Sequence, residues 1–444
     1  MANTIDLIGD SQAFDDIISR RISGHFEDDV VENIYSYCFC GCTALETVSF
    51  PNVTDIDTRA FASCSSLTSV NFQALVSIGS SRCYQFEYCP SLVHMSFPNL
   101  ISTAFAMFFG CSGLTIANFP KLVTISSSTF YKCEMLSTLS MPLVETIGSY
   151  AFCDCHGLTS VEFSNVTSIG GYAFERCSAL TLASFPEATT VGNAAFNRCS
   201  TLTTVSMPKA TTIPTTAFQC CSSLSSVVFP MVTSIGSSAF QSCYSLTDVS
   251  FPIATTIQSF AFRFCSSLRS AVFPSVNFIG SSAFIGCSSL ETVSFPMLSS
   301  ISANAYLFSD CYAIKYAYFN ILSSIPSDLL RNCSLLVDIS FPSAITVGTG
   351  AFSGCTSLET ATFPVASTLS SSVFKGCATL KSLYLLKGGT CQLSGIGQFD
   401  GTPITDSSYL GYYGSIFVPE SLVNTYKANA SWASYADRIT AYTP

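Results

Sequence analysis

Hydrophobic and polar residues follow two different periods along the chain, and the stretch SSAFQSCYSLTDVSFP (residues 237–252) contains both. The apolar residues in and just before its first half have helical spacing: Ile235, Ala239, Phe240, Cys243 and Leu246. In the following TDVSF, Val249 and Phe251 are two residues apart, which is the period of a strand with one buried face. Pro252 ends that strand because proline has no amide proton to donate. The pattern therefore predicts a short helical turn followed by a short strand, with glycine in SIGSSAF allowing a tight entry.

The same unit recurs along most of the chain, and cysteine marks its register. The step between marker cysteines is 22 residues, except for 25 before Cys89 and 24 before Cys311. Phe stands three residues before each, with Leu330 the exception, and Leu three residues after, with Ile314 the exception. The markers are Cys42, Cys64, Cys89, Cys111, Cys133, Cys155, Cys177, Cys199, Cys221, Cys243, Cys265, Cys287, Cys311, Cys333, Cys355 and Cys377. Since one coil cannot bury its own Phe and Leu, the repeat predicts a stacked solenoid.

The repeat divides the chain into three parts: an N-terminal cap (1–33), sixteen repeats (34–386) and a C-terminal capping module (387–444). In the first part, one helical face is apolar: Phe14, Ile17, Ile18 and Ile22. In the last, we expect a strand over 416–418, a short helix from Pro419 and packing by Trp432. The extra residues near Cys83 and near Tyr306 predict loops at one edge of the solenoid. The fold class is thus a capped rod or arc, with a parallel strand per coil on one face and short helical turns on the other.

Composition narrows the function classes. Only 10% of the residues are charged and the formal net charge is −10, which disfavours a nucleic-acid partner. No run of 18 apolar residues predicts a membrane-spanning helix. The start MANTIDLIGDSQAFDD lacks the apolar segment of a Sec signal peptide. Localisation is left open between the cell surface, a virion and the cytoplasm.

The 22 cysteines do not indicate chemistry. In register, the marker cysteines form a buried ladder of reduced thiols that behave as small hydrophobic side chains. Six others lie off this ladder: Cys38, Cys40, Cys83, Cys153, Cys220 and Cys391. The CFCGC stretch has no second ligand pair at the spacing of a zinc site, so no metal is expected. Neither His25, His94 nor His156 belongs to a catalytic motif, and nothing predicts an enzyme or a cofactor.

The combination L-x-x-V-x-F-P with V-x-x-I-G-x-x-A-F-x-x-C-x-x-L resembles the BspA-like class of leucine-rich repeats over residues 34–386. The residues 416–439 also resemble a C-terminal module of gut-bacterial members. The resemblance implies a surface or secreted adhesion protein of anaerobic or gut-dwelling bacteria.

The outward strand positions are mostly Ser or Thr, such as Thr138 and Ser140, which is typical of a solvated sheet. The C-terminal coils depart from this with tyrosine and charge, which suit a binding patch. Its predicted residues are Arg269, Lys315, Tyr316, Tyr318, Asp338, Lys381 and Tyr384. We therefore expect a non-catalytic adhesion protein that recognises a protein or a glycan on a cell surface through the strand face. A prophage tail-associated receptor-binding protein and an intracellular scaffold remain alternatives.

Overall fold

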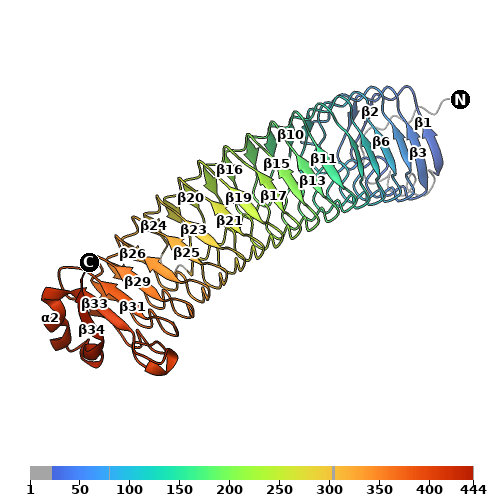
Figure 1. The fold of residues 1–444 in the computed structure, drawn as a ribbon. Helices are drawn as coiled ribbons and strands as arrows, with labels where there is room; N and C mark the ends of the chain where they lie inside the picture. The colour runs from blue at the N-terminus through green and yellow to red at the C-terminus, as the bar shows by residue number, and fades with distance from the viewer. Residues whose placement is uncertain (1–22, 80, 303–305, 444) are drawn as a thin grey trace. The chain divides into compact units, whose positions relative to one another are not determined.

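The computed structural model describes residues 23–79, 81–302 and 306–443 and divides into two units. Unit 1 comprises residues 1–210 and 216–228, and unit 2 comprises residues 211–215 and 229–444. Each unit is a solenoid of parallel strands, in which each coil lies beside the next (Figure 1). The predicted apolar helical face at Phe14, Ile17, Ile18 and Ile22 lies outside the described residues.

Unit 1 has two rows of strands. The long strands, each of which after β1 follows a marker cysteine, form three sheets: β1 (Gly24–Glu27), β3 (Leu45–Ser49) and β5 (Ser69–Asn71); β6 (His94–Ser96), β7 (Ile116–Asn118) and β9 (Thr138–Ser140); and β11 (Ser160–Glu162), β13 (Leu182–Ser184), β15 (Thr204–Ser206) and β17 (Ser226–Val228). The short strands form two more: β2 (Asn33–Ile34) and β4 (Asp55–Ile56); and β8 (Thr124–Ile125), β10 (Thr146–Ile147), β12 (Ser168–Ile169) and β14 (Thr190–Val191).

Unit 2 repeats this arrangement. Its long strands are β19 (Asp248–Ser250) and β21 (Ser270–Val272), followed by the sheet of β23 (Thr292–Ser294), β25 (Tyr316–Tyr318), β27 (Asp338–Ser340), β29 (Thr360–Phe363), β31 (Ser382–Leu385), β33 (Ser415–Pro419) and β34 (Ile439–Tyr442). Its short strands are β16 (Thr212–Ile213), β18 (Ser234–Ile235), β20 (Thr256–Ile257), β22 (Phe278–Ile279) and β24 (Ser300–Ile301), then β26 (Ser324–Ile325), β28 (Thr346–Val347), β30 (Thr368–Leu369) and β32 (Gln392–Leu393). The sequence pattern did not predict this second row of strands.

Short helical turns were predicted opposite the long strands, and the structure has tight turns with little helix there. The segment before each marker cysteine is a run of tight turns whose amide groups alternate in direction. The amides of Ala239, Gln241 and Cys243 donate to carbonyls three residues earlier in their own coil. Those of Ser238, Phe240 and Ser242 donate to the next coil. A helix would direct all of them within the segment, whereas here half of them bind neighbouring coils together.

The core consists of two columns of phenylalanine rings. One column comes from the Phe before each marker cysteine, as in Phe240 and Phe262, whose ring centroids are 5.3 Å apart. The other comes from the long strands, as in Phe251 and Phe273, at 5.7 Å. All four rings are buried. Repetition of one ring in one place thus produces a continuous apolar interior, as the repeat predicts.

Close approach of the coils explains the glycine in the repeat better than a tight entry does. A Cβ on Gly280 would lie 2.7 Å from the carbonyl carbon of Gln258 in the coil before. The backbone of Gly280 is not left-handed, so the requirement at this position is space between coils.

The abundance of Ser and Thr also has a structural reason. Many of their hydroxyl groups donate to the main chain of the preceding coil. Thr181 Oγ1 lies 2.9 Å from the carbonyl oxygen of Thr159, and Thr203 Oγ1 lies 2.9 Å from that of Thr181. Hydroxyls that bridge coils in this way stabilise the stack without charge.

The C-terminal segment continues the sheet and adds the helices found among the described residues. After β33 come the 3₁₀ turn η2 (Glu420–Leu422), the helix α2 (Val423–Ala428) and the 3₁₀ helix η3 (Ala433–Arg438), while η1 (Ser407–Tyr409) precedes it. Trp432 and Tyr426 are fully buried. The indole N–H of Trp432 donates to the carbonyl oxygen of Cys391 (2.7 Å), and the hydroxyl of Tyr426 accepts from the amide of Cys391 (2.7 Å). In the described residues, no helix has the length and apolar character needed to cross a bilayer.

Candidate binding faces

We call the outer side of the long strands the strand face, and the outer side of the turns before each marker cysteine the turn face. On the strand face of unit 2, β25 presents Tyr316 and Tyr318, with Ala317 buried between them. The two tyrosines are 51% and 53% exposed, which is high for side chains of this size. Asp338 is exposed and lies beside Tyr316 in the register of β27. The structure therefore brings these three predicted residues together.

Two of the predicted charged residues, Lys315 and Lys381, lie next to these strands, and each forms an ion pair with a glutamate of the preceding coil. Lys315 Nζ lies 3.4 Å from Glu291 Oε2, and Lys381 makes an ion pair with Glu359. The hydrogen bond to Glu359 raises the pKa of Lys381. Exposed pairs of this kind add little stability, so they remain available to exchange partners.

Two predicted residues lie toward the ends of this face. Arg269 lines a hollow of about 450 Å³, together with Val272, Glu291 and Thr292. Tyr384 is half-buried, because its ring stacks on Phe417 at 4.7 Å and meets the edge of Tyr442 at 5.8 Å. Tyr384 is thereby engaged with the C-terminal strands, unlike Tyr316 and Tyr318.

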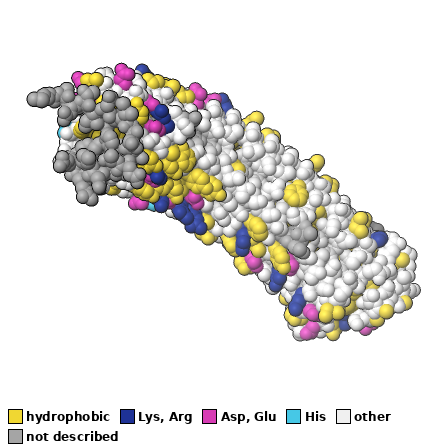
Figure 2. Space-filling view, turned by 180° about the vertical axis from the view of Figure 1, so that it is seen from behind, with side chains coloured by type: hydrophobic (Ala, Val, Ile, Leu, Met, Phe, Trp, Pro, Cys, Tyr) yellow, Lys and Arg dark blue, Asp and Glu magenta, His cyan; other side chains and the backbone are white. Residues whose placement is uncertain are grey.

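A second surface, on the turn face of unit 1, was missed in the sequence. Seven aromatic side chains from five consecutive coils form what we call the aromatic stripe: Tyr84, Tyr88, Phe105, Phe109, Tyr131, Tyr150 and Tyr172. Seen from behind, unit 1 shows hydrophobic side chains gathered on its surface with charged ones near them (Figure 2). The signal in the sequence was aromatic residues at outward turn positions in successive repeats, which the inward Phe column obscures.

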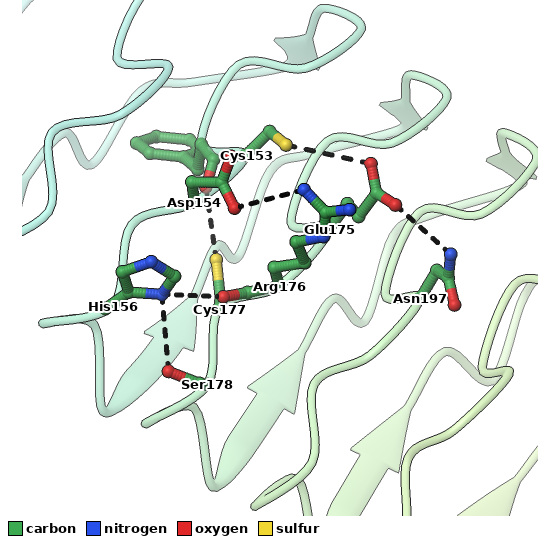
Figure 3. Close-up of polar contacts among 9 residues, drawn as sticks. Cys153, Asp154, His156, Glu175, Arg176, Cys177, Ser178 and Asn197 are labelled. Carbon is green, nitrogen blue, oxygen red and sulfur yellow. Dashed lines mark hydrogen bonds and ion pairs between the residues drawn. The ribbon is translucent and has the colours of Figure 1, made fainter. Parts of the chain in front are cut away.

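Figure 3 shows a cluster of polar side chains from the coils that contain Tyr150 and Tyr172 and from the coil after them. Arg176 Nη1 lies 3.8 Å from Asp154 Oδ1, and Glu175 Oε1 accepts a hydrogen bond from Asn197 Nδ2 at 3.2 Å. Desolvation raises the pKa of Tyr131, with further contributions that include Cys153 and Asp154, which places this ring next to the cluster. Apolar rings and hydrogen-bonding groups thus adjoin on one surface.

The marker cysteines are structural. Each thiol whose contact is described points at the carbonyl oxygen of the phenylalanine, or its equivalent, in the preceding coil, as in Cys265 to Phe240 (3.1 Å) and Cys177 to Phe152 (3.1 Å). Burial raises the pKa of Cys265 and of Cys355 to about 12. They are therefore weak hydrogen-bond donors rather than nucleophiles. In the described part of the chain, no group of three or more His, Cys, Asp or Glu side chains could hold a metal ion.

Ion pairs between Arg82 and two aspartates of the preceding coil hold the insertion near Cys83 in place. Arg82 makes an ion pair with Asp55, and its Nε lies 3.4 Å from Asp57 Oδ1. The insertion near Tyr306 includes residues 303–305, which lie outside the described residues.

Comparison with known proteins identifies the repeat. The family model described as BspA type leucine rich repeat region matches in six copies, over residues 11–137, 145–268 and 255–381. The chain belongs to the BspA-type leucine-rich repeat family. Repeat solenoids of this family are generally binding proteins rather than enzymes. No curated protein matches this BspA-type chain.

The solved structures that match include bacterial leucine-rich repeat proteins. A leucine-rich repeat protein from Bacteroides ovatus is 22% identical, with a TM-score of 0.55, and the match covers 83% of this chain and 88% of that one. A leucine rich cell surface protein from Faecalibacterium prausnitzii is 19% identical, with a TM-score of 0.32 and 86% coverage of both chains. At such identity, the first likeness shows the fold alone.

Proposed function

We propose that this protein is a non-catalytic adhesion protein that binds a protein partner through the strand face of unit 2. The observation that carries the proposal is the pair Tyr316 and Tyr318, each about half exposed on one strand of a regular sheet. Tyrosine supplies a large contact area with few rotatable bonds and is enriched at binding hot spots.

The surroundings of the two tyrosines favour a protein over other ligands. Asp338 and the Lys315–Glu291 pair place both signs of charge around the rings. An apolar centre with a charged rim is the usual anatomy of a protein–protein interface. The hollow beside Arg269 offers a place for one partner side chain.

A first prediction tests this face. Purified protein is screened by surface plasmon resonance against an array of secreted and cell-surface proteins, and each hit is titrated with variants. Tyr316→Ala combined with Tyr318→Ala should weaken the dissociation constant at least about tenfold, or ~1.4 kcal/mol, because both anchors are lost. The thermal midpoint should be unchanged, since neither ring is part of the core.

The control is Thr138→Ala combined with Ser140→Ala on β9, which should bind normally. Loss of binding in this control together with normal binding by the tyrosine variant would exclude the proposed face. Binding of glycans alone would exclude the proposed class of partner.

A further inference from the structure

The aromatic stripe is continuous from ring to ring. Tyr84 meets Phe105 at 5.5 Å, Tyr88 meets Phe109 at 5.3 Å, and Phe109 meets Tyr131 at 5.1 Å. Tyr131 then meets Tyr150 at 6.2 Å, and Tyr150 stacks on Tyr172 at 4.7 Å. Because the rings hold one another in place, the surface is ordered before any ligand arrives. At about 4.8 Å per coil, five coils span roughly 20 Å.

The backbone under the stripe does not require aromatic residues. Tyr84, Tyr88, Tyr150 and Tyr172 have φ values of 62°, 54°, 58° and 59°. The same left-handed conformation recurs at these turn positions in most coils, where the residues include Ser128, Lys132, Arg176 and Gly110. Since the turn accepts many side chains, folding alone does not account for a run of aromatic rings on this surface.

The exposed edges of the rings favour a ligand that is partly apolar. Tyr88 is 49% exposed, Phe105 43% and Tyr150 37%. The rings are therefore packed on one side and open to solvent on the other. An extended ligand could lie across several coils and contact each ring in turn.

The charges around the stripe are balanced. Among the described contacts, three cations and three anions border it: Arg59, Lys132 and Arg176 with Glu87, Asp154 and Glu175. Arg59 Nε pairs with Glu87 Oε2 at 3.0 Å, and Arg176 pairs with Asp154 at 3.8 Å. Such a border attracts neither an acidic nor a basic ligand strongly, but it offers many donors and acceptors to hydroxyl groups.

We propose that the aromatic stripe of unit 1 is a binding surface for a neutral polysaccharide. A sugar ring has apolar C–H groups that contact exposed aromatic carbon atoms, and hydroxyl groups that hydrogen-bond to carboxylate, amide and guanidinium groups. Tyr131, Tyr150 and Tyr172 supply the first contact, and Asp154, Glu175 and Arg176 the second. This surface is separate from the strand face proposed above, and it would serve a different class of ligand.

Affinity electrophoresis in gels containing one neutral polysaccharide each, a β-glucan, a mannan, a galactan or a xylan, tests the proposal. At least one should retard the full chain. Tyr150→Gly combined with Tyr172→Gly should reduce the retardation at least tenfold, and Tyr88→Gly combined with Phe105→Ala should do the same. Glycine is chosen at the left-handed positions so that the thermal midpoint is kept or raised.

The variant Tyr316→Ala with Tyr318→Ala is the matched control and should be retarded like the unchanged chain, which separates this site from the strand face. The proposal is overturned if no neutral polysaccharide retards the chain, or if the stripe variants are retarded normally. Retardation by sulfated or uronic polysaccharides only would overturn it as well, as would a stripe that proves to mediate self-association without sugar.

Discussion

At the scale of single residues, Gln85 is a polar side chain in an unfavourable buried position. It is fully buried at a position where many other coils have Ala, as at Ala60 and Ala151. Neither its amide nitrogen nor its amide oxygen has a hydrogen-bond partner among the described residues. A buried amide without partners lowers stability because its hydration is lost and nothing replaces it.

We therefore predict that Gln85→Met raises the free energy of unfolding by about 1–3 kcal/mol. Methionine has a similar volume and no strongly polar atoms, so it fills the same space. Urea unfolding followed by circular dichroism measures the change.

Gln398 provides the control for this prediction. It is also buried, but its amide donates to the carbonyl oxygen of Ser394 at 3.3 Å. Gln398→Met should therefore lower stability. Equal effects of the two substitutions would show that hydrogen bonding at Gln85 is satisfied in solution.

At the scale of the repeating element, the marker cysteines link one coil to the next. Each marker thiol whose contact is described reaches the coil before, as in Cys287 to Phe262 at 3.2 Å. Burial raises the pKa of these thiols, so the thiolate is disfavoured in the folded state.

Two outcomes follow for the cysteines. At pH 8 a thiol reagent should label few ladder cysteines of the folded chain, and in denaturant it should label nearly all 22. Because the folded pKa lies above the ordinary value of 9.0, stability should be full below that value. It should then fall as the pH rises toward 12, since only the unfolded chain releases the proton readily.

Peptide mapping without reductant provides the check on this prediction. Several disulfides between ladder cysteines would contradict it. Half-buried Cys83 and Cys220 are the internal reference, because they should react first.

At the scale of the whole molecule, the exposed edges of the terminal coils decide solubility. At the N-terminal edge, β1 pairs with β3. The ring of Phe26 in β1 packs on the rings of Phe39 and Phe50, with centroids 5.5 Å apart in each case. At the other end β33 and β34 extend the sheet beyond β31. We propose that these segments act as caps, because an uncovered coil would present apolar side chains and unpaired strand edges to water.

Deletion of residues 415–444 should cause association that the full chain does not show at the same concentration. The truncation removes both partners of the Cys391 peptide group, Tyr426 and Trp432, and leaves β31 as an open edge. Sedimentation velocity measures the change.

Trp432→Phe serves as the milder variant. It keeps β33 and β34 but loses the indole hydrogen bond, so it should lower stability by about 1–3 kcal/mol without association. If the truncated chain remains a monodisperse species of unchanged stability, the segment is not a cap.

The amino-acid sequence by itself determined the repeat, its register, the parallel strand of each coil and the inward column of Phe, Cys and Leu. These depend on residues within one repeat, and repetition makes each of them visible many times. The sequence also placed Tyr316, Tyr318 and Asp338 on one face, because strand alternation is simple to count. The sequence also predicted the strand in the C-terminal segment and the packing of Trp432 in its interior.

Only the tertiary structure decided what the non-strand half of each coil does. The spacing of Ala239, Phe240 and Cys243 suits a helix, but the amide of Phe240 donates to the next coil, which local spacing cannot reveal. For the same reason the pairing of Glu291 with Lys315, the engagement of Tyr384 by Phe417 and the ring-to-ring contacts of the aromatic stripe were not foreseen. Each depends on residues about 20 or more positions apart, which become neighbours only when the coils stack.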